Sequence, residues 1–178
     1  MSSSARAIVL GASLMLAACN PTQPSGNANV PQPAKPVELS RYVGRWHEQA
    51  RYEASFQKGC EAVTADYAAK PDGSIAVVNS CREGSVSGPL RTAEATAKVV
   101  DGSNNAKLKV SFFPPFQGDY WVLDRAADYS WSIVGEPSGQ YLWILTRSPR
   151  ITDREYARLV ARAAALGYDT AMLRRTAQ

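Results

Sequence analysis

The sequence predicts an all-β domain, an eight-stranded antiparallel up-and-down barrel with one α-helix near the C-terminus packed on its wall. Three observations lead to this class: short segments in which apolar and polar residues alternate, turn residues between them, and one late stretch with helical spacing. Barrel closure leaves no exposed sheet edge. The expected strands cover residues 44–52, 61–68, 74–81, 92–100, 106–113, 119–124, 129–136 and 141–147.

The first of these strands carries two sets of side chains with different character. Because successive side chains in a strand point to opposite faces, each set shares one face. One set is predicted to face inward onto a cavity, since it holds two aromatic rings and a carboxylate, and the other is polar throughout. An ordinary strand with a buried Trp is the alternative. The first set is Trp46, Glu48, Ala50 and Tyr52, and the second is Arg45, His47, Gln49 and Arg51.

A single helix is expected after the last strand. Thr152 and Glu155 have the spacing of a capping box, with Thr152 as the N-cap. Gly167 is typical of the residue that ends a helix. The apolar residues between them recur at helical spacing and should lie against the barrel wall: Tyr156, Leu159, Val160, Ala163 and Leu166.

Residues 1–18 are expected to be a lipoprotein signal peptide, outside the folded domain. Arg6 is followed by an apolar run at residues 7–16, which is too short to span a bilayer as a stable helix. The run ends in the sequence LAAC at residues 16–19, which resembles the lipobox of bacterial lipoproteins. A secretory signal followed by a chance Cys is the alternative.

The lipobox resemblance implies that Cys19 becomes the first residue of the mature chain and receives lipid. Several acyl chains on one residue give stable anchoring in a membrane. Asn20 does not resemble the signal for inner-membrane retention. The resemblance therefore implies a lipid-anchored protein of the outer membrane that faces the periplasm.

The segment at residues 19–37 is expected to be a tether that begins at the lipidated Cys. It contains five prolines among Ser, Asn, Gln and Gly, and offers almost nothing to bury. Extended at about 3.1 Å per residue, it would reach on the order of 50 Å. Its composition favours a spacer between membrane and domain over a segment that wraps onto the fold.

Two further cysteines are expected to form a disulfide. Cys60 and Cys81 lie at similar distances on either side of a turn at residues 70–73, which places them approximately opposite each other across a hairpin. An exported domain folds in an oxidising compartment, where such a bond persists.

Composition argues against several classes of function. The net charge is +4, and no basic block is interleaved with aromatic residues, so nucleic-acid binding has little support. His47 is the only histidine and is expected on a polar strand face, so no metal site is predicted. No cofactor motif is present, and the oligomeric state is not predictable from the sequence.

Three motifs together resemble the signature regions of the lipocalins. They are Gly44-Arg45-Trp46 on the first strand, Asp128-Tyr129 before the seventh, and Arg147 at the end of the eighth. The sequences WHEQARY at 46–52, VVN at 77–79 and KVSFFPPF at 109–116 are similar to the bacterial outer-membrane lipocalins, the branch related to apolipoprotein D. The resemblance covers residues 38–178, which we take as the domain.

The resemblance implies structural roles for the signature residues. Trp46 would close the narrow end of the barrel, and Arg147 would pack across its ring in a cation–π contact. Gly44 would allow close approach of a neighbouring segment. Asp128 and Tyr129 complete the structural set.

Alternation and the resemblance together predict a ligand pocket inside the barrel. An eight-stranded barrel has room for one small ligand or for packed side chains. The expected lining combines apolar walls with a few polar groups that could orient an amphiphile. It comprises Glu48, Tyr67, Val77, Asn79, Val110, Phe112, Tyr120 and Trp143.

These expectations favour a non-enzymatic protein that binds, stores or transports a lipophilic ligand, a fatty acid or a lysophospholipid. An isomerase-type enzyme on the same fold is one alternative, with Glu48 as its single inward carboxylate. A structural envelope lipoprotein with a filled barrel is another.

Overall fold

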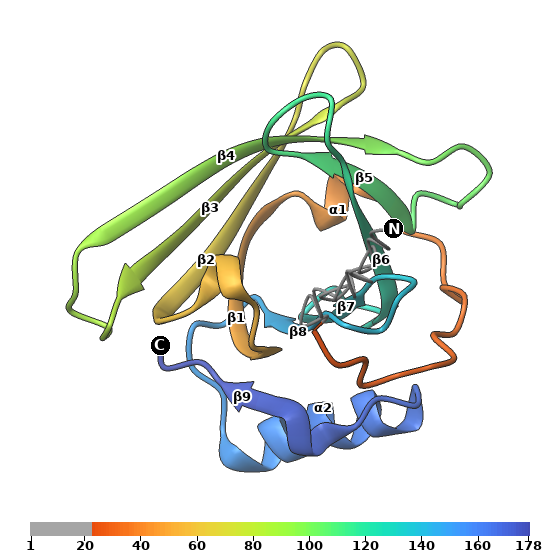
Figure 1. The fold of residues 1–178 in the computed structure, drawn as a ribbon. Coiled ribbons are helices and arrows are strands. Elements are labelled where there is room, and N and C mark those ends of the chain that lie inside the picture. Colours follow the sequence, from red (N-terminus) through yellow and green to blue (C-terminus); the bar gives the residue numbers. More distant parts are fainter. Residues whose placement is uncertain (1–22) are drawn as a thin grey trace, which may run out of the picture.

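A computed structural model describes residues 23–178 and shows the predicted barrel (Figure 1). The signal peptide and Cys19 lie outside the described residues. Strand order confirms an up-and-down arrangement in which each strand from β1 to β8 pairs with the next, and β1 pairs with both β8 and β2. The strands are β1 (Gly44–Tyr52), β2 (Cys60–Ala69), β3 (Ile75–Glu83), β4 (Leu90–Val99), β5 (Lys107–Ser111), β6 (Gly118–Arg125), β7 (Trp131–Gly135) and β8 (Leu142–Thr146).

The connections divide the barrel into two ends. We call the end formed by the β1–β2, β3–β4, β5–β6 and β7–β8 loops the mouth, and the opposite end the closed end. Short helix α1 (Leu39–Tyr42) precedes β1 at the closed end, and the 3-10 turn η1 (Ser55–Gln57) lies in the β1–β2 loop at the mouth. The two ends therefore differ in the elements that cover them.

A bulge changes the facing of β1. Its pairing with β8 shifts register between Glu48 and Ala50. Beyond that point Ala50 and Tyr52 pack against the helix outside the barrel, not inside it as alternation predicted. Arg51, predicted on the outer polar face, is fully buried. An extra residue in one strand reverses which side chains face inward, and this accounts for both errors.

The C-terminal residues complete the wall where β1 and β2 separate. Pairing of β1 with β2 covers only residues 44–47 and 64–67. Toward the mouth, the short strand β9 (Leu173–Arg175), which sequence analysis missed, pairs with β1. The amide of Ala62 on β2 donates to the carbonyl of Ala177 at 2.7 Å. The tail thus bridges the two strands.

The predicted helix is confirmed as α2 (Asp153–Ala165). Thr152 is its N-cap and accepts a hydrogen bond from the amide of Glu155 at 3.2 Å. Leu159 and Ala163 are fully buried against the outer face of the barrel. The 3-10 turn η2 (Thr170–Met172) leads from the helix toward β9. Among residues 23–178, the helices lack the length and apolar character needed to cross a membrane.

The N-terminal segment 23–37 lies along the domain, so the prediction of a free spacer is wrong for these residues (Figure 1). Near its start, the amide of Gly26 donates to the carbonyl of Gly139 at 3.0 Å. Near its end, the ammonium of Lys35 lies 2.8 Å from the carboxylate of Asp124. Backbone hydrogen bonds and polar side chains hold the segment on the domain. A low content of apolar residues therefore does not prevent it from packing there. We refer to residues 23–37 as the strap.

The disulfide between Cys60 and Cys81 is confirmed, with their Cα atoms 5.4 Å apart. The two residues are not directly opposite, because Cys60 pairs with Glu83 and Cys81 lies diagonally across the hairpin. A register shift between Glu61 and Thr64 accounts for the offset. The bond fastens the mouth half of β2 to β3.

Candidate functional site

Trp46 and Arg147 form the floor of the barrel interior at the closed end. The Trp46 ring is fully buried, and the Arg147 guanidinium carbon lies 3.8 Å from its centre. Arg147 also donates to the carbonyls of Arg41, Tyr42, Val43 and Arg45 at 2.7–3.0 Å. The carbonyls of Arg41, Tyr42 and Val43 lie at the end of α1, where so short a helix offers them no partner, and that of Arg45 lies on β1. The predicted cation–π contact is therefore confirmed.

The other signature residues support this floor. Gly44 has φ of +94°, a conformation that favours glycine, and a Cβ atom there would lie 3.4 Å from the Arg147 guanidinium. The Tyr129 hydroxyl accepts a hydrogen bond from the amide of Glu38 at 2.8 Å. Asp128 accepts one from the amide of Ser130 at 3.0 Å and shapes the turn before β7. The sequence predicted that Tyr129 begins the seventh strand, but Tyr129 lies in the turn before it, because β7 begins at Trp131.

Above the floor, a group of hydroxyls crosses the interior. The Tyr42 hydroxyl lies 2.8 Å from that of Tyr120 and 3.1 Å from that of Ser132. The Tyr67 hydroxyl donates to that of Tyr120 at 3.1 Å. Burial raises the pKa of Tyr42 to about 12 and that of Tyr120 well above its usual value. The hydroxyls therefore stay neutral near neutral pH and donate the hydrogen bonds that join this group.

The inner face becomes progressively more accessible toward the mouth. On β4, three alanines alternate on the inner face: Ala97 is fully buried, Ala95 is partly buried, and Ala93 is exposed. Ala95 packs against the same core cluster as Tyr67 and Val77. These inward side chains are small and become accessible to solvent toward the mouth, whereas the side chains at the closed end, such as Trp46, are fully buried.

Glu48 is inside the wall but is not free to meet a ligand. Its carboxylate lies 2.8 Å from the guanidinium of Arg51 and accepts hydrogen bonds from Thr176 and Gln57, both at 2.5 Å. Glu48 and Arg51 are both almost wholly buried. The carboxylate is therefore already engaged within the wall, and its role in orienting a ligand stays a prediction. Sequence reasoning missed its partners because the bulge and the chain end bring them there.

Trp143 lies on the inner face of β8, as predicted, and packs against the main core cluster. Its indole nitrogen donates to the side-chain carbonyl of Gln57 at 3.1 Å. The Tyr141 ring stacks on it at 5.8 Å, and Phe56 in the β1–β2 loop lies 5.6 Å beyond Tyr141. An aromatic row thus leads from the mouth loop into the interior.

Phe112 departs from its predicted place on the inner wall. Strand β5 ends at Ser111, one residue before Phe112, and the chain turns through Pro114 and Pro115. Phe112 is 40 % exposed and belongs to the β5–β6 loop at the mouth. The remaining predicted lining residues, apart from Glu48, lie on the inner face: Tyr67, Val77, Asn79, Val110, Tyr120 and Trp143.

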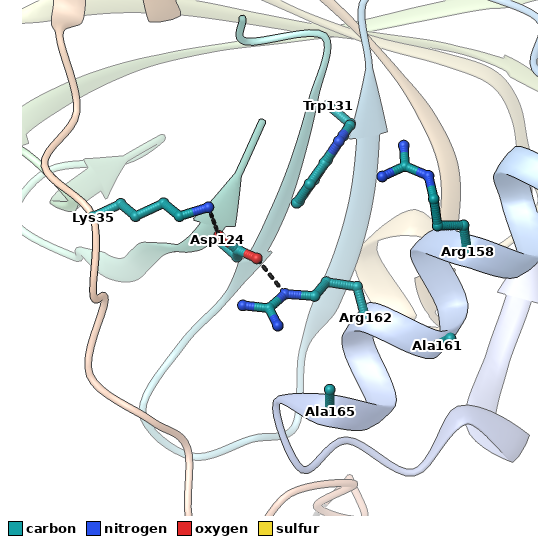
Figure 2. A pocket seen from close by; sticks show the side chains of 7 residues that line it. All are labelled: Lys35, Asp124, Trp131, Arg158, Ala161, Arg162 and Ala165. Atoms are coloured by element: carbon teal, nitrogen blue, oxygen red, sulfur yellow. Dashed lines mark hydrogen bonds and ion pairs between the residues drawn. The ribbon is translucent and has the colours of Figure 1, made fainter. Parts of the chain in front are cut away.

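A separate groove of about 370 Å³ lies outside the barrel, between the strap and α2 (Figure 2). At its base, Asp124 is held by Lys35 from the strap and by Arg162 from α2. Burial alone would raise the pKa of Asp124, but hydrogen bonds from these two cations outweigh it and lower the pKa. Its charged lining suits fixation of the strap and α2, and differs from the apolar interior.

Comparison with known proteins agrees with this geometry. The family described as lipocalin-like domain matches residues 37–178. This chain belongs to the lipocalin family. Its relatives include outer membrane lipoprotein Blc of Vibrio cholerae, which is 39 % identical over 82 % of this chain and 87 % of that protein. Outer membrane lipoprotein Blc of Escherichia coli K12 is 36 % identical over 92 % of this chain and 89 % of its own length.

Two further proteins match a smaller part of the chain or match it at lower identity. Rat apolipoprotein D is 36 % identical over 66 % of each chain. The structure of insecticyanin from the tobacco hornworm superposes with a TM-score of 0.68 at 20 % identity, covering 86 % of this chain and 87 % of that one. At such identity the likeness supports the fold of this lipocalin and not its ligand.

Proposed function

We propose that this lipocalin binds one lipophilic molecule, a fatty acid or a lysophospholipid, in the mouth half of its barrel, and stores or transports it at the outer membrane. One observation carries the proposal: the inner face is lined mostly by apolar side chains that become accessible to solvent toward the mouth, whereas Trp46 is fully buried at the closed end. A blind apolar pocket open at one end suits an acyl chain.

The same geometry weighs against the two alternatives. A filled barrel would bury its inward side chains along their whole length, yet Ala95 is partly accessible and Ala93 is exposed. For an isomerase-type enzyme, the inward carboxylate of Glu48 would act as a base, but it is engaged with Arg51 and Thr176. A protein that only binds a ligand does not need a free carboxylate at Glu48.

Anchoring at the outer membrane completes the proposed function. The relatives from Vibrio cholerae and Escherichia coli are outer membrane lipoproteins by name. The LAAC sequence at residues 16–19 supplies the residue for the lipid, Cys19. We propose that Cys19 carries acyl chains in the periplasmic leaflet and holds the barrel there.

Filling the pocket is expected to abolish ligand binding. Ala95→Trp places an indole in the mouth half of the barrel, and Trp143→Ala removes apolar contact worth about 1–3 kcal/mol to a bound chain. Titration of a fluorescent fatty acid and a fluorescent lysophospholipid measures both effects. Glu94→Trp is the matched control, since Glu94 is the exposed neighbour of Ala95 on the outer face. Equal affinity of Ala95→Trp and Glu94→Trp would place the ligand elsewhere.

Loss of the lipidated residue is expected to release the protein from the membrane. With Cys19→Ser, the lipid cannot be attached, so the protein should be released to the periplasm or should keep its signal peptide. Membrane fractionation measures this change. Cys60→Ser and Cys81→Ser together form the control, because they change thiols of the domain and leave LAAC intact. Unchanged outer-membrane retention of Cys19→Ser would contradict the anchor.

A further inference from the structure

Exposed large apolar side chains gather at one end of this lipocalin. Within residues 23–178, six large apolar side chains are exposed, and each belongs to a mouth loop or to the strand residue next to one. Phe113 and Phe116 in the β5–β6 loop are the most exposed, at 78 % and 77 %. Exposed apolar residues concentrated in one region mark an interaction surface. The full set is Phe56, Val86, Leu90, Phe112, Phe113 and Phe116.

The strap begins at this same end. Gln23 donates from its side-chain amide to the carbonyl of Gln140 at 2.8 Å, and the Ser25 hydroxyl donates to the carbonyl of Ser138 at 2.9 Å. Both acceptors are in the β7–β8 loop at the mouth. A Cβ atom on Gly139 would lie 1.9 Å from the carbonyl oxygen of Asn27, so the strap is seated directly on this loop.

The far part of the strap is fixed at the closed end. The amide of Val37 donates to the carbonyl of Asn104 in the β4–β5 loop at 2.9 Å. The Arg125 guanidinium donates to the carbonyl of Pro36 at 2.5 Å. The strap therefore spans the barrel from end to end, and the chain leaves the described domain beside the mouth.

Chain length then limits how far the proposed anchor can be from the mouth. Cys19 precedes Gln23 by four residues. Even fully extended, four residues span at most about 14 Å. A lipid on Cys19 therefore keeps Gln23, which is hydrogen-bonded to the β7–β8 loop, within about 14 Å of the lipidated residue. This is much shorter than the long spacer that the composition suggested.

From these two observations we propose that the barrel docks on the phospholipid leaflet of its own anchor with its mouth toward the lipid and its Phe-rich loops inserted in the interface. The inference rests on the lipid anchor at Cys19 in the proposed function and adds an orientation and a lipid-contacting surface. Aromatic side chains are favoured at membrane–water interfaces. The aromatic row Phe56–Tyr141–Trp143 then leads from the leaflet into the pocket, so an acyl chain passes between them without crossing water.

Apolar contact, rather than charge, supplies the docking energy. Among the basic residues at the rim, Arg91 lies 3.4 Å from Glu83, whereas Lys58 and Arg82 are exposed. High salt and neutral vesicles remove the attraction of these two residues and leave the apolar contact. Attraction between basic residues and anionic lipid falls with salt, whereas burial of Phe113 and Phe116 does not. Docking is therefore expected to persist at high salt and on vesicles of neutral phospholipid.

Depth-dependent quenching tests the orientation in the full lipidated protein. A fluorescent label is placed at the mouth through Ser87→Cys or Gln117→Cys, and at the closed end through Lys70→Cys or Asp101→Cys, all four positions being exposed. The protein is reconstituted in vesicles of phosphatidylethanolamine and phosphatidylglycerol that carry quenchers in the acyl region. Quenching at positions 87 and 117, with none at 70 and 101, is expected. Equal quenching at both ends, or none at either, overturns the proposal.

Vesicle flotation of the unlipidated Cys19→Ser chain tests the loops themselves. Phe113→Ser with Phe116→Ser is expected to weaken binding to the same vesicles by at least about tenfold, because two exposed rings no longer enter the interface. The control is Lys70→Ser with Asp101→Ser, two exposed positions at the closed end. Equal loss in both pairs, or no loss, overturns the proposal. A doubled mass in solution that is lost in the variant with Phe113→Ser and Phe116→Ser also overturns the proposal, because a second copy of the chain would then cover the mouth.

The same proteins separate this inference from the proposed ligand binding. A fluorescent fatty acid is titrated into each labelled variant without vesicles. A barrel that docks by its mouth but binds no fatty acid or lysophospholipid would refute the ligand and retain the orientation. A barrel that binds the fatty acid but is not quenched at positions 87 and 117 would refute the orientation alone.

Discussion

Arg51→Met is expected to destabilise the domain by about 3–5 kcal/mol, because it leaves a buried carboxylate without its counter-ion. The guanidinium of Arg51 is 2.8 Å from the Glu48 carboxylate and also donates to the carbonyls of Cys60 and Gln57 at 3.2 and 3.1 Å. These bonds tie β1 to the β1–β2 loop and to the start of β2. Chemical denaturation of the unlipidated domain measures the loss.

A double-mutant cycle separates the ion pair from packing. Glu48→Leu with Arg51→Met removes both charges, and its cost should fall below the sum of the single changes by about 1–3 kcal/mol. Arg45→Met is the matched control: Arg45 lies 2.9 Å from Asp66, but its side chain is 61 % exposed. An exposed pair contributes about 0–1 kcal/mol, so this control should be nearly neutral. A similar small loss in Arg51→Met would show that the buried pair does not stabilise the wall.

Strand positions were predictable because each strand of this barrel has one face inside and one outside. On β2 and β3, the inward residues Tyr67 and Val77 pair in register, and alternation alone identifies both. The helix was predictable because its cap is local: Thr152 and Glu155 are three residues apart and bond directly. Local residue patterns and the spacing of apolar residues therefore determine most of the architecture.

The bulge in β1 was not predictable, because Gln49 is neither Gly nor a turn residue. It reverses the facing of Arg51 and brings a guanidinium into the wall. Pairing with β9, far along the chain, then supplies Thr176 as a further partner of Glu48. The polar part of the candidate site depends on these long-range contacts, so alternation identified its apolar lining better than its charged groups.

The strap shows why composition is a weak guide for segments with few apolar residues. Its seat consists of loop carbonyls, such as that of Gly139, and of the close approach that glycine permits there. Asn27 is buried and donates to the carbonyl of Leu166 at 3.0 Å. The sequence of the strap does not reveal that the carbonyls of Gly139 and Leu166 are its partners. A hydrogen-bonded segment needs a complementary surface more than it needs hydrophobic side chains.

Trp46→Ala is expected to cost about 3–5 kcal/mol and to lower the melting temperature by about 10 °C, with little effect on the ligand affinity of the molecules that remain folded. The ring is fully buried, donates from its indole nitrogen to the Tyr42 carbonyl at 2.8 Å, and lies beneath Arg147. Its loss opens a cavity at the closed end and removes the surface on which the guanidinium stacks. Thermal unfolding measures the stability, and fluorescent fatty-acid titration measures the affinity.

Two further variants test whether Trp46 closes the end of the barrel or contacts the ligand. Trp46→Phe keeps an aromatic ring under Arg147 and should be less destabilising than Trp46→Ala, since the lost indole hydrogen bond is worth about 0.5–1.5 kcal/mol. Trp143→Ala should show the reverse pattern, with weaker ligand binding, because its ring lines the open half. If Trp46→Ala keeps wild-type stability but loses the ligand, the acyl chain reaches the closed end and the filled floor is wrong. If both alanine variants lose stability alone, the bound chain lies above Trp143, nearer the mouth.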